Sequence, residues 1–350
     1  MKIGLYGLPT SGKTYILEKI DFIKVIQGSR MLHELCPEFD SVDEDKKSIV
    51  RQKLANLLAK EETFIMDGHY SFGDNVVFTE ADGCLYDTFM YLYISPEALE
   101  SRMKMSERNR KYLVNDVEEW QNTEIDKLRE YCHTNDKDFY VIDNPPTNVF
   151  DNVSEVLDFI RTVVNGFSCK RMAERCTNKI LMDSHSDTIV LMDGDKTLTT
   201  EDTSHAVFGY TTHIYDGNFY TGYQSWRQSK EFESYSFENL TDIPVPINEE
   251  VNKAITNDTF ILTSGHEKVW HYIASQLNVP FYSGVEMAAE TKFFITKNLQ
   301  KANKKVVAYG DGMNDYYMLK QADKGFLVTK KDGSISRSLR KKNIEGLNCV

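Results

Sequence analysis

The sequence lacks several features that would place the chain outside an ordinary globular fold. No apolar run is long enough to span a membrane, and the opening residues MKIGLYGLPT contain no apolar stretch of signal-peptide length. The cysteines are few, scattered and without a CxxC pair: Cys36, Cys84, Cys132, Cys169, Cys176 and Cys349. This pattern favours reduced thiols over a disulfide framework or a zinc site. We therefore expect a cytoplasmic protein without a membrane partner.

Positive charge is also scarce. The chain has 41 Lys and Arg against 53 Asp and Glu, which gives a net charge of −12. Phosphate backbones select basic faces, so this balance disfavours a dedicated nucleic-acid binder, although a local basic groove would still permit one. The sequence contains no internal repeat and no low-complexity tract.

Short apolar runs alternate with longer amphipathic stretches in both halves of the chain, which is typical of βαβ units around a parallel sheet. The stretch NGFSCKRMAERCTNKILMDSHSD, residues 165–187, interrupts this alternation, and a second series begins at residue 188. The length of 350 residues is compatible with two domains. The sequence predicts an α/β chain of two doubly wound parallel-sheet domains, 1–166 and 187–350, joined by a linker over 167–186.

The first candidate site is GLPTSGKT at residues 7–14, which fits G-x-x-x-x-G-K-[ST] between an apolar strand and a helix-compatible run. Gly7 and Gly12 let the backbone turn its N–H groups toward phosphate oxygens, and the helix start adds a positive dipole end. Lys13 supplies a charge to the β- and γ-phosphates, and Thr14 a hydroxyl to Mg²⁺. The motif predicts binding of ATP or another nucleoside triphosphate with Mg²⁺.

Residues 1–165 resemble the P-loop kinases of the adenylate-kinase-like group. FIMDGHY places Asp67 where that group has an acidic residue that steadies the metal, and His69 stands where some members carry a histidine. The run SPEALESRMKMSERNRKY corresponds to a lid whose arginines meet the transferring phosphoryl group, here Arg102 and Arg108, unless the run is a solvated helical face. The stretch NPPTN, residues 144–148, stands where such kinases often hold the adenine.

The second candidate site begins at LMDGDKTLTT, residues 191–200. Asp193 and Asp195 would repel each other unless something positive lay between them. Three further pieces follow in order: FILTSGH with Ser264, AAETKFF with Lys292, and VVAYGDGMNDYYML with Asp311 and Asp315. Each piece lies at a predicted strand end or helix start, and that edge of a parallel sheet is where ligands bind.

These four pieces in this order resemble the haloacid-dehalogenase phosphatase superfamily, in its phosphoserine-phosphatase-like branch, over residues 187–330. The resemblance implies a Rossmann-like fold in which Asp193 attacks phosphorus and forms an aspartyl-phosphate. It implies that Asp195 protonates the leaving oxygen and later deprotonates the attacking water. One departure is Lys196, which stands where the family often has glycine.

The resemblance also implies a magnesium site. Mg²⁺ would lie between Asp193, the backbone carbonyl of Asp195, and Asp311, with Asp315 supporting that shell. Ser264, or its neighbour Thr263, and Lys292 would hold the phosphoryl oxygens. The two aspartates of the opening pair then become tolerable, because a metal ion neutralises them.

Residues 200–245 stand where the superfamily has a small cap that closes over the substrate. They are rich in aromatic residues, most of which we expect in the core of the cap: Phe208, Tyr210, Tyr215, Phe219, Tyr220, Tyr223 and Trp226. A cap excludes water and bulky substrates, so it favours a small phosphate ester over a polymer end.

The sequence therefore predicts a bifunctional enzyme, an ATP-dependent kinase followed by a Mg²⁺-dependent phosphatase, acting on small metabolites or nucleotides. Two alternatives stay open. The order of the domains also resembles phage-type polynucleotide kinase-phosphatase, which heals nucleic-acid ends. In the third interpretation the N-terminal domain binds nucleotide without turnover and gates the phosphatase. The expected partners are a small phosphate ester and a nucleoside triphosphate; nothing in the sequence indicates the oligomeric state.

Overall fold

The structure is a computed structural model that describes residues 1–143, 153–209, 212–234 and 245–350. The expected adenine-binding stretch at 144–148, Tyr210 and part of the expected cap lie outside the described residues. The chain divides into two compact units, Met1–Phe167 and Ser168–Val350, here called the N-terminal and C-terminal units. Among the described residues no helix has both the length and the apolar character needed to cross a membrane.

The N-terminal unit is built on a five-stranded sheet in which every pair of neighbouring strands is parallel, in the order β2-β3-β1-β6-β7. Its strands are β1 (Lys2–Tyr6), β2 (Val25–Ile26), β3 (Phe64–Asp67), β6 (Thr88–Leu92) and β7 (Asp138–Ile142). A short antiparallel hairpin, β4 (Ser71–Phe72) and β5 (Asn75–Val76), follows β3. The helices are α1 (Lys13–Leu17), α2 (Gly28–Leu35), α3 (Glu44–Leu58), α4 (Glu80–Leu85), α5 (Pro96–Met105), α6 (Val117–Thr134) and α7 (Val153–Val164).

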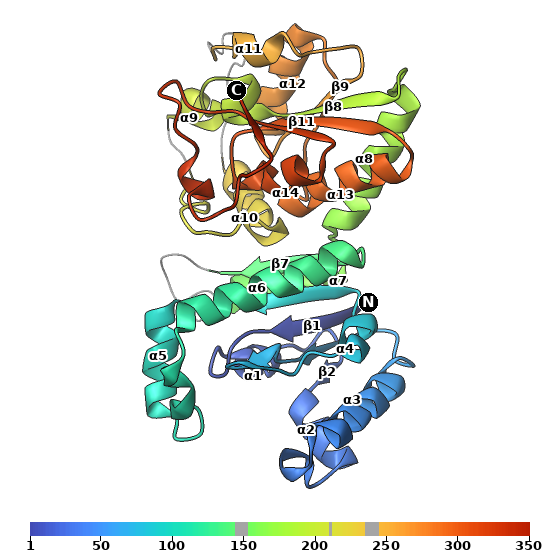
Figure 1. Ribbon diagram of the computed structural model, residues 1–350, viewed down its shortest axis with the longest axis vertical. Coiled ribbons are helices and arrows are strands. Elements are labelled where there is room, and N and C mark those ends of the chain that lie inside the picture. The colour runs from blue at the N-terminus through green and yellow to red at the C-terminus, as the bar shows by residue number, and fades with distance from the viewer. Residues whose placement is uncertain (144–152, 210–211, 235–244) are drawn as a thin grey trace. The chain divides into compact units, whose positions relative to one another are not determined.

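The order of the strands places the loop after β1 at the point where the chain changes from one side of the sheet to the other. From β1 the chain builds β2 and β3 on one side, and then β6 and β7 on the other. Ligands of parallel sheets bind at such a point, beyond the carboxyl ends of the strands. The residues that follow β1 and β3 therefore share one edge, and Figure 1 shows the strands of this unit with α5 standing beside them.

The C-terminal unit contains a six-stranded sheet, also parallel throughout, in the order β10-β9-β8-β11-β12-β13. Its strands are β8 (Thr188–Asp193), β9 (Thr259–Leu262), β10 (Phe281–Tyr282), β11 (Lys305–Gly310), β12 (Lys324–Leu327) and β13 (Asn348–Cys349). The helices are α8 (Cys169–Asp183), α9 (Thr203–Phe208), α10 (Gly222–Phe232), α11 (Glu249–Asn252), α12 (Glu267–Leu277), α13 (Ala289–Lys301) and α14 (Met313–Gln321). The expected α/β class with parallel sheets is confirmed.

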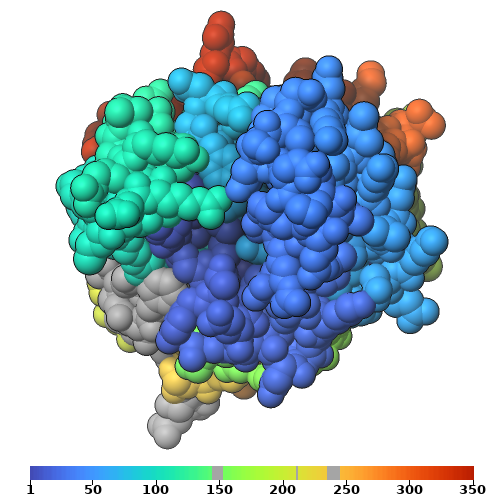
Figure 2. Space-filling view, turned by 90° about the horizontal axis from the view of Figure 1, so that it is seen from below, coloured from blue at the N-terminus to red at the C-terminus, as the bar shows by residue number. Residues whose placement is uncertain are grey.

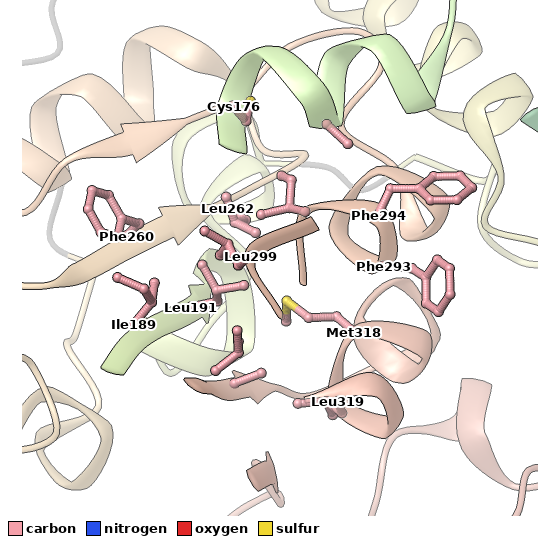
Figure 3. Close-up of a cluster of buried hydrophobic side chains, with 14 of the residues drawn as sticks. Cys176, Ile189, Leu191, Phe260, Leu262, Phe293, Phe294, Leu299, Met318 and Leu319 are labelled. Atoms are coloured by element: carbon pink, nitrogen blue, oxygen red, sulfur yellow. The ribbon is translucent and has the colours of Figure 1, made fainter. Parts of the chain in front are cut away.

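Two hydrophobic cores cover the two faces of this second sheet. Successive side chains of a strand point to opposite faces. Ile189 and Leu191 of β8 accordingly join a core with α8, α13 and α14, shown in Figure 3, whereas Val190 and Met192 join a second core with α11 and α12. Figure 1 shows α13 and α14 on one side of the sheet and α11 and α12 on the other. The C-terminal unit is therefore doubly wound.

The stretch expected to be a linker is instead largely helical. Residues Cys169–Asp183 form α8, which packs against α13 and belongs to the C-terminal unit. Ser168 caps the helix by accepting a hydrogen bond from the N–H of Arg171. Ala173, Cys176 and Ile180 are buried along one face, at the three- and four-residue spacing of an amphipathic helix. The sequence alternation is interrupted here because an additional helix precedes the second sheet. We had expected a linker between the domains over these residues.

The segment expected to form a cap contributes α9 and α10 among its described residues. It leaves and rejoins the unit through neighbouring residues: Thr199 forms an antiparallel bridge with Ile247, and the N–H of Thr200 donates to the carbonyl of Pro246 at 2.9 Å. Phe219, Tyr223 and Trp226 are buried, as expected for cap core.

Candidate functional site

The loop after β1 adopts the backbone that its glycines permit. Gly7 and Gly12 have φ angles of 149° and 99°, in the region where residues with a Cβ are strained. The helix that follows, α1, is only five residues long. Lys13 is buried, and its Nζ donates to the carbonyl oxygens of Gly7 at 2.6 Å and Leu8 at 3.1 Å. Burial lowers the pKa of Lys13 to about 8, although the carboxylates of Asp67 and Glu124 oppose this shift.

A cavity of about 920 Å³ opens beside this loop. Its lining includes Gly12, Lys13, Thr14 and Asp67, and the predicted lid residue Arg108. Figure 2 shows the surface of this face hollowed between the blue α2–α3 segment and the teal residues around position 110. The carboxylate of Asp67 accepts a hydrogen bond from the N–H of Gly28 at 2.9 Å, which fixes one of its oxygens at the end of β3.

The second predicted lid residue, Arg102, does not line this cavity. Its Nη1 lies 3.4 Å from the carbonyl oxygens of both Thr10 and Ser11, so the guanidinium contacts the backbone of the loop. His69 does line the cavity, with its ring 4.6 Å from that of Phe72. Burial, with the charges of Lys13 and Arg108, holds the pKa of His69 well below its ordinary value, so its ring is neutral at physiological pH.

Glu124, a buried residue of α6, holds the hairpin that follows His69 by hydrogen bonds. One carboxylate oxygen accepts hydrogen bonds from the N–H and Oγ of Ser71, at 2.9 and 2.7 Å, and from Trp120 Nε1 at 3.2 Å. The other oxygen accepts from Tyr91 Oη at 2.9 Å. Burial raises the pKa of Glu124, and these donors oppose that rise. No sequence motif pointed to this residue, because a lone glutamate in a helix has no distinguishing pattern.

The second candidate site joins the carboxyl ends of three adjacent strands. Asp193 ends β8, Ser264 follows β9 and Asp311 follows β11. Since β8 lies between β9 and β11 in a parallel sheet, all three residues reach the same edge. The structure therefore brings together three of the four sequence pieces at this edge, and the fourth, with Lys292, lies on α13.

Lys292, on α13, is completely buried and lies between two carboxylates. Its Nζ donates to Asp193 Oδ1 at 2.5 Å and to Asp315 Oδ1 at 2.7 Å. Burial opposes the charge on the lysine, but Asp193 and Asp315 outweigh it and raise the pKa of Lys292 above its ordinary value. The ammonium therefore stays charged, and it neutralises part of the negative charge that the opening pair of aspartates creates.

Carboxylate oxygens of Asp193, Asp311 and Asp315 lie within 4.8 Å of one another, close enough to share one cation. Burial raises the pKa of Asp311 well above its ordinary value and that of Asp315 to about 6, and neighbouring carboxylates add to both shifts. Hard oxygen ligands that repel one another suit a small divalent cation. The residues present thus fit Mg²⁺.

Asp195 is held by contacts on both oxygens. Oδ1 accepts a hydrogen bond from the N–H of Thr203 at 2.7 Å, and Oδ2 lies 3.4 Å from Trp270 Nε1. Burial raises the pKa of Asp195 to about 7; the charges of Asp202 and Asp193 add to the rise, and the Thr203 N–H opposes it. A carboxyl group with a pKa near neutrality can both give and take a proton.

Ser264 rather than Thr263 faces the second site. Ser264 lines the cavity there and donates its hydroxyl proton to the carbonyl of Met287 at 2.5 Å, while accepting from Asn314 Nδ2 at 2.8 Å. Thr263 is buried, and its Oγ1 accepts from the N–H of Gly265. Asn314 lies within GDGMND, and its contact with Ser264 was not predicted.

Lys196, the departure from the family pattern, has a φ of 59°. Glycine adopts this left-handed conformation freely, whereas a residue with a Cβ adopts it at a cost. The Lys196 ammonium donates to Asp202 Oδ2 at 2.9 Å. Asp202 in turn caps α9, because its Oδ1 accepts from the N–H groups of Ser204 and His205. Thr203, at the start of this helix, is the residue whose N–H contacts Asp195.

Above the carboxylates lies a cavity of about 330 Å³. Three cap aromatics line it, namely Tyr215 and Tyr220, which the sequence singled out without assigning them to the substrate side, and Phe232. Tyr215 and Tyr220 stack with ring centroids 4.9 Å apart. The cavity thus extends from the predicted catalytic carboxylates to the cap.

A family of haloacid dehalogenase-like hydrolases matches residues 195–337. This range covers less than half of the chain, lies entirely within the C-terminal unit and begins two residues after Asp193. The C-terminal unit therefore contains a region similar to haloacid dehalogenase-like hydrolases, in line with the expectation. The match does not extend into the N-terminal unit.

No curated protein matches the chain. Among solved structures, a HAD family hydrolase from Salmonella enterica serovar Typhi is 16% identical, with 42% of this chain and 63% of that chain covered and a TM-score of 0.29. This chain thus spans less than two thirds of the length of that hydrolase. A phosphoserine phosphatase in apo form is 13% identical over 41% of this chain and 88% of that chain, with a TM-score of 0.27. A shikimate kinase from Acinetobacter baumannii in complex with shikimate is 15% identical over 48% and 95%, with a TM-score of 0.34. None of these likenesses bears on the activity of this chain.

Proposed function

We propose that the C-terminal unit hydrolyses phosphomonoesters through an aspartyl-phosphate on Asp193. The observation that carries this proposal is the position of Lys292, which lies between Asp193 and Asp315 at one edge of a cluster of three carboxylates. A strand-end carboxylate beside a buried ammonium is suited to an incoming dianionic phosphoryl group. The family match over 195–337 supports the same reaction class.

In the first step an oxygen of Asp193 forms a bond to phosphorus, and the bond from phosphorus to the ester oxygen breaks. The leaving oxygen takes a proton from Asp195, so that an alcohol departs. In the second step a water oxygen bonds to phosphorus, Asp195 accepts the proton of the water, and the bond to Asp193 breaks. The products are an alcohol and inorganic phosphate, and both aspartates return to their first state.

Mg²⁺, held by Asp193, Asp311 and Asp315 with the backbone carbonyl of Asp195, would supply positive charge against the phosphoryl oxygens. Lys292 and the Ser264 hydroxyl hold the same oxygens from the protein side. The Thr203 N–H fixes Oδ1 of Asp195, and Oδ2, which lies 3.4 Å from Trp270 Nε1, exchanges a proton with the leaving group.

The test is phosphate release from p-nitrophenyl phosphate by the full chain. We expect turnover with Mg²⁺, none in excess EDTA, and a loss of about three orders of magnitude or more in Asp193→Asn, because the nucleophile is gone. Asp187→Asn, an exposed exchange of the same kind, is the matched control and should keep the activity. Hydrolysis that survives EDTA, or that survives Asp193→Asn, would contradict the proposal.

We further propose that the N-terminal unit binds a nucleoside triphosphate with Mg²⁺ and transfers its terminal phosphoryl group. Support comes from the joint presence of Gly12, Lys13, Thr14 and Asp67 around one cavity, with Arg108 on its rim. Lys13 would leave the carbonyls of its own loop for the β- and γ-phosphates, Thr14 would hold the metal, and Arg108 would meet charge on the transferring group.

Calorimetric titration of the full chain with ATP and with GTP in Mg²⁺ tests this second proposal. Binding that is lost in Lys13→Ala would support it, and a following screen for acceptors would separate a kinase from a nucleotide-binding regulator. The second proposal is contradicted if no nucleoside triphosphate binds at millimolar concentration.

A further inference from the structure

The cavity above the catalytic carboxylates restricts the alcohol part of the ester, provided that the C-terminal unit is the phosphatase proposed above. At about 330 Å³ the cavity is near the lower end of the roughly 300–1,000 Å³ that small-molecule sites span. The phosphoryl group takes the end near Asp193, so the remaining volume accommodates a small alcohol.

The charge of the cavity is negative beyond the catalytic centre. Of the described residues that line it, Lys196 is the one with an ammonium or guanidinium group, and that ammonium is paired with Asp202 at 2.9 Å. The buried ammonium of Lys292 is already shared by two carboxylates. Among the described lining residues, a second anionic group on the substrate would therefore meet no ammonium or guanidinium group that is not already paired.

The cap that closes this cavity is also acidic. Residues 200–245 contain seven Asp and Glu against one Arg and one Lys. Those two cations lie over rings of buried cap residues: Arg227 over Tyr223 at 5.9 Å and Lys230 over Trp226 at 3.7 Å. The stretches 210–211 and 235–244, which the structure does not describe, contain no Lys, Arg or His in their sequence. The cap thus offers an anion little charge to pair with and attracts a cation.

The part of the cavity lining formed by Tyr215, Asp216, Tyr220 and Gln228, here called the wall, combines a carboxylate with aromatic rings. Asp216 lines the cavity with its side chain 59% exposed, and its Oδ2 lies 2.9 Å from Nδ1 of the exposed His213. Tyr220 stacks on Tyr215, which precedes Asp216 in the chain. Gln228 Oε1 accepts a hydrogen bond from Tyr215 Oη at 3.2 Å, which orients the amide on the same wall. A carboxylate beside an aromatic face is a combination that binds ammonium groups.

We propose that the phosphatase substrate is the phosphate monoester of a small amino alcohol, with its ammonium group held at Asp216 and the face of Tyr220. The catalytic centre accepts the phosphoryl group of any monoester, and the wall selects the alcohol by charge. Esters whose alcohol carries a carboxylate or a second phosphate are rejected, which includes the 3′-phosphate of a polynucleotide with its adjacent phosphodiester.

The experiment compares three esters of similar size on the full chain with Mg²⁺: 2-aminoethyl phosphate, propyl phosphate and phosphoserine. The first pair differs in the ammonium group, and phosphoserine adds a carboxylate to the aminoethyl ester. We expect kcat/KM to fall in that order, by up to about fivefold at each step, since a charge contact at an exposed carboxylate is screened and worth about that factor. A 3′-phosphorylated oligonucleotide should rank with phosphoserine or below.

Three variants test whether the effect comes from Asp216. Asp216→Asn removes the charge from an exposed residue, so folding is preserved, and it should bring the rates for the aminoethyl and propyl esters together. The matched exchange Asp187→Asn, 96% exposed and outside the cavity, should keep the ratio of the two rates. Arg337→Gln removes a cation whose charge acts on Tyr220, so it should not lower the ratio.

The possible outcomes distinguish a wrong substrate class from a wrong reaction. Turnover of p-nitrophenyl phosphate together with equal rates for the three esters, or with a preference for phosphoserine or the oligonucleotide, overturns the inference and leaves the proposed phosphatase standing. An aminoethyl preference that survives Asp216→Asn but is lost in Arg337→Gln or Asp187→Asn also overturns it. If p-nitrophenyl phosphate is not hydrolysed, the proposed function and this inference both fail.

Discussion

At the scale of single residues, the second site depends on two glycines that face one indole ring. A Cβ on Gly194 would lie 2.3 Å from Trp270 Cζ2, and one on Gly265 would lie 2.3 Å from Trp270 Nε1 and 2.7 Å from Asp195 Oδ2. All three distances are shorter than Cβ atoms show in real structures, so the ring and the carboxylate occupy space that is open only because these residues are glycines. Trp270 itself is fully buried, so it cannot move away cheaply.

Gly265→Ala should therefore displace both Trp270 and Asp195. We expect a loss of about 1–3 kcal/mol in the free energy of unfolding, because the added methyl group overpacks a filled core. Hydrolysis of alkyl phosphates should fall by about tenfold or more, because the proton donor is misplaced. Urea unfolding and phosphate release measure the two effects.

Gly312→Ala is the control for stability, since the atom nearest to its added Cβ is 3.6 Å away. It should unfold at nearly the same urea concentration as the unchanged protein. Equal stability of Gly265→Ala and Gly312→Ala would show that the indole can give way.

Residue types and their order were sufficient to predict the carboxylates, the lysine and the serine of this site. The sequence could not indicate Trp270 or Thr203, because the contact of Asp195 with each is made by a group that carries no motif: an indole N–H in an apolar helix and a backbone N–H. The sequence also could not show which aromatic residues of the cap line the cavity and which lie in the core. Tyr215, Tyr220 and Phe232 differ from Phe219, Tyr223 and Trp226 by the direction they face, and direction is set by the packing of the cap.

At the scale of elements, the first turn of α9 connects Lys196 to Asp195, the proposed proton donor. The Lys196 ammonium contacts Asp202, Asp202 caps the helix, and the N–H of the next residue, Thr203, contacts Asp195. A shift of this turn would move Asp195 without touching Asp193. We therefore regard Lys196 and Asp202 as positioning residues.

Asp202→Ala should slow the hydrolysis of an alkyl phosphate by about tenfold, because a poor leaving group needs its proton from Asp195. The rate for p-nitrophenyl phosphate should change by less than about threefold, because that leaving group departs without help. A mere loss of folding would lower both rates alike. Steady-state rates for the two esters, with the ratio of the two as the readout, provide the measurement.

Asp202→Asn separates the two contacts of this residue, because asparagine keeps the cap of α9 but loses the charge that pairs with Lys196. If the ion pair positions the turn, Asp202→Asn and Lys196→Gly should give the same intermediate ratio of rates. Glycine is suitable at position 196 because its φ is 59°. Equal ratios in all variants and in the unchanged protein would contradict the positioning role.

In the N-terminal unit, α6 and the hairpin after β3 are joined at Glu124. Four donors point at this carboxylate, so an amide in its place would set an N–H₂ group against donors. Glu124→Gln should lower the free energy of unfolding of the unit by about 1–3 kcal/mol. Thermal or urea unfolding measures it, and Glu119→Gln, on the exposed face of the same helix, should leave stability within about 0.5 kcal/mol. A neutral result for Glu124→Gln would mean that the carboxyl is already protonated.

The periodicity of the chain predicted the strands at the core of both sheets but not α8 or the β4–β5 hairpin. Long parallel strands are buried on both faces and appear as continuous apolar runs, which a sequence shows plainly. Helix α8 is polar except for one narrow face, and the hairpin strands have two residues each. Their positions depend on α13 and Glu124, which are distant in the sequence.

At the scale of the whole molecule, each proposed site is assembled within one unit. The residues of the first are contributed by Met1–Phe167, and those of the second by Ser168–Val350. The two proposed activities should therefore be separable by point variants of the full chain.

Lys13→Ala should weaken nucleotide binding by about tenfold or more, since it removes a charge from the β- and γ-phosphates, and should leave hydrolysis of p-nitrophenyl phosphate within about twofold. Asp193→Asn should do the opposite. Calorimetry and phosphate release on both variants give four values. Loss of hydrolysis in a folded Lys13→Ala protein would favour the interpretation in which nucleotide gates the phosphatase.

The path of the chain into and out of the cap has a consequence for protein engineering. The cap departs after Thr199 and the chain returns at Ile247, and these two residues face each other across an antiparallel bridge. Neither core strand β8 nor β9 is interrupted by the insertion. A segment whose ends already meet can be exchanged for a foreign one, or cut down to a short turn, without rethreading the sheet. Under the proposed function, a cap from a haloacid dehalogenase-like hydrolase could therefore be joined at 199 and 247 to change which alcohol is released, while the sheet and its carboxylates stay in place.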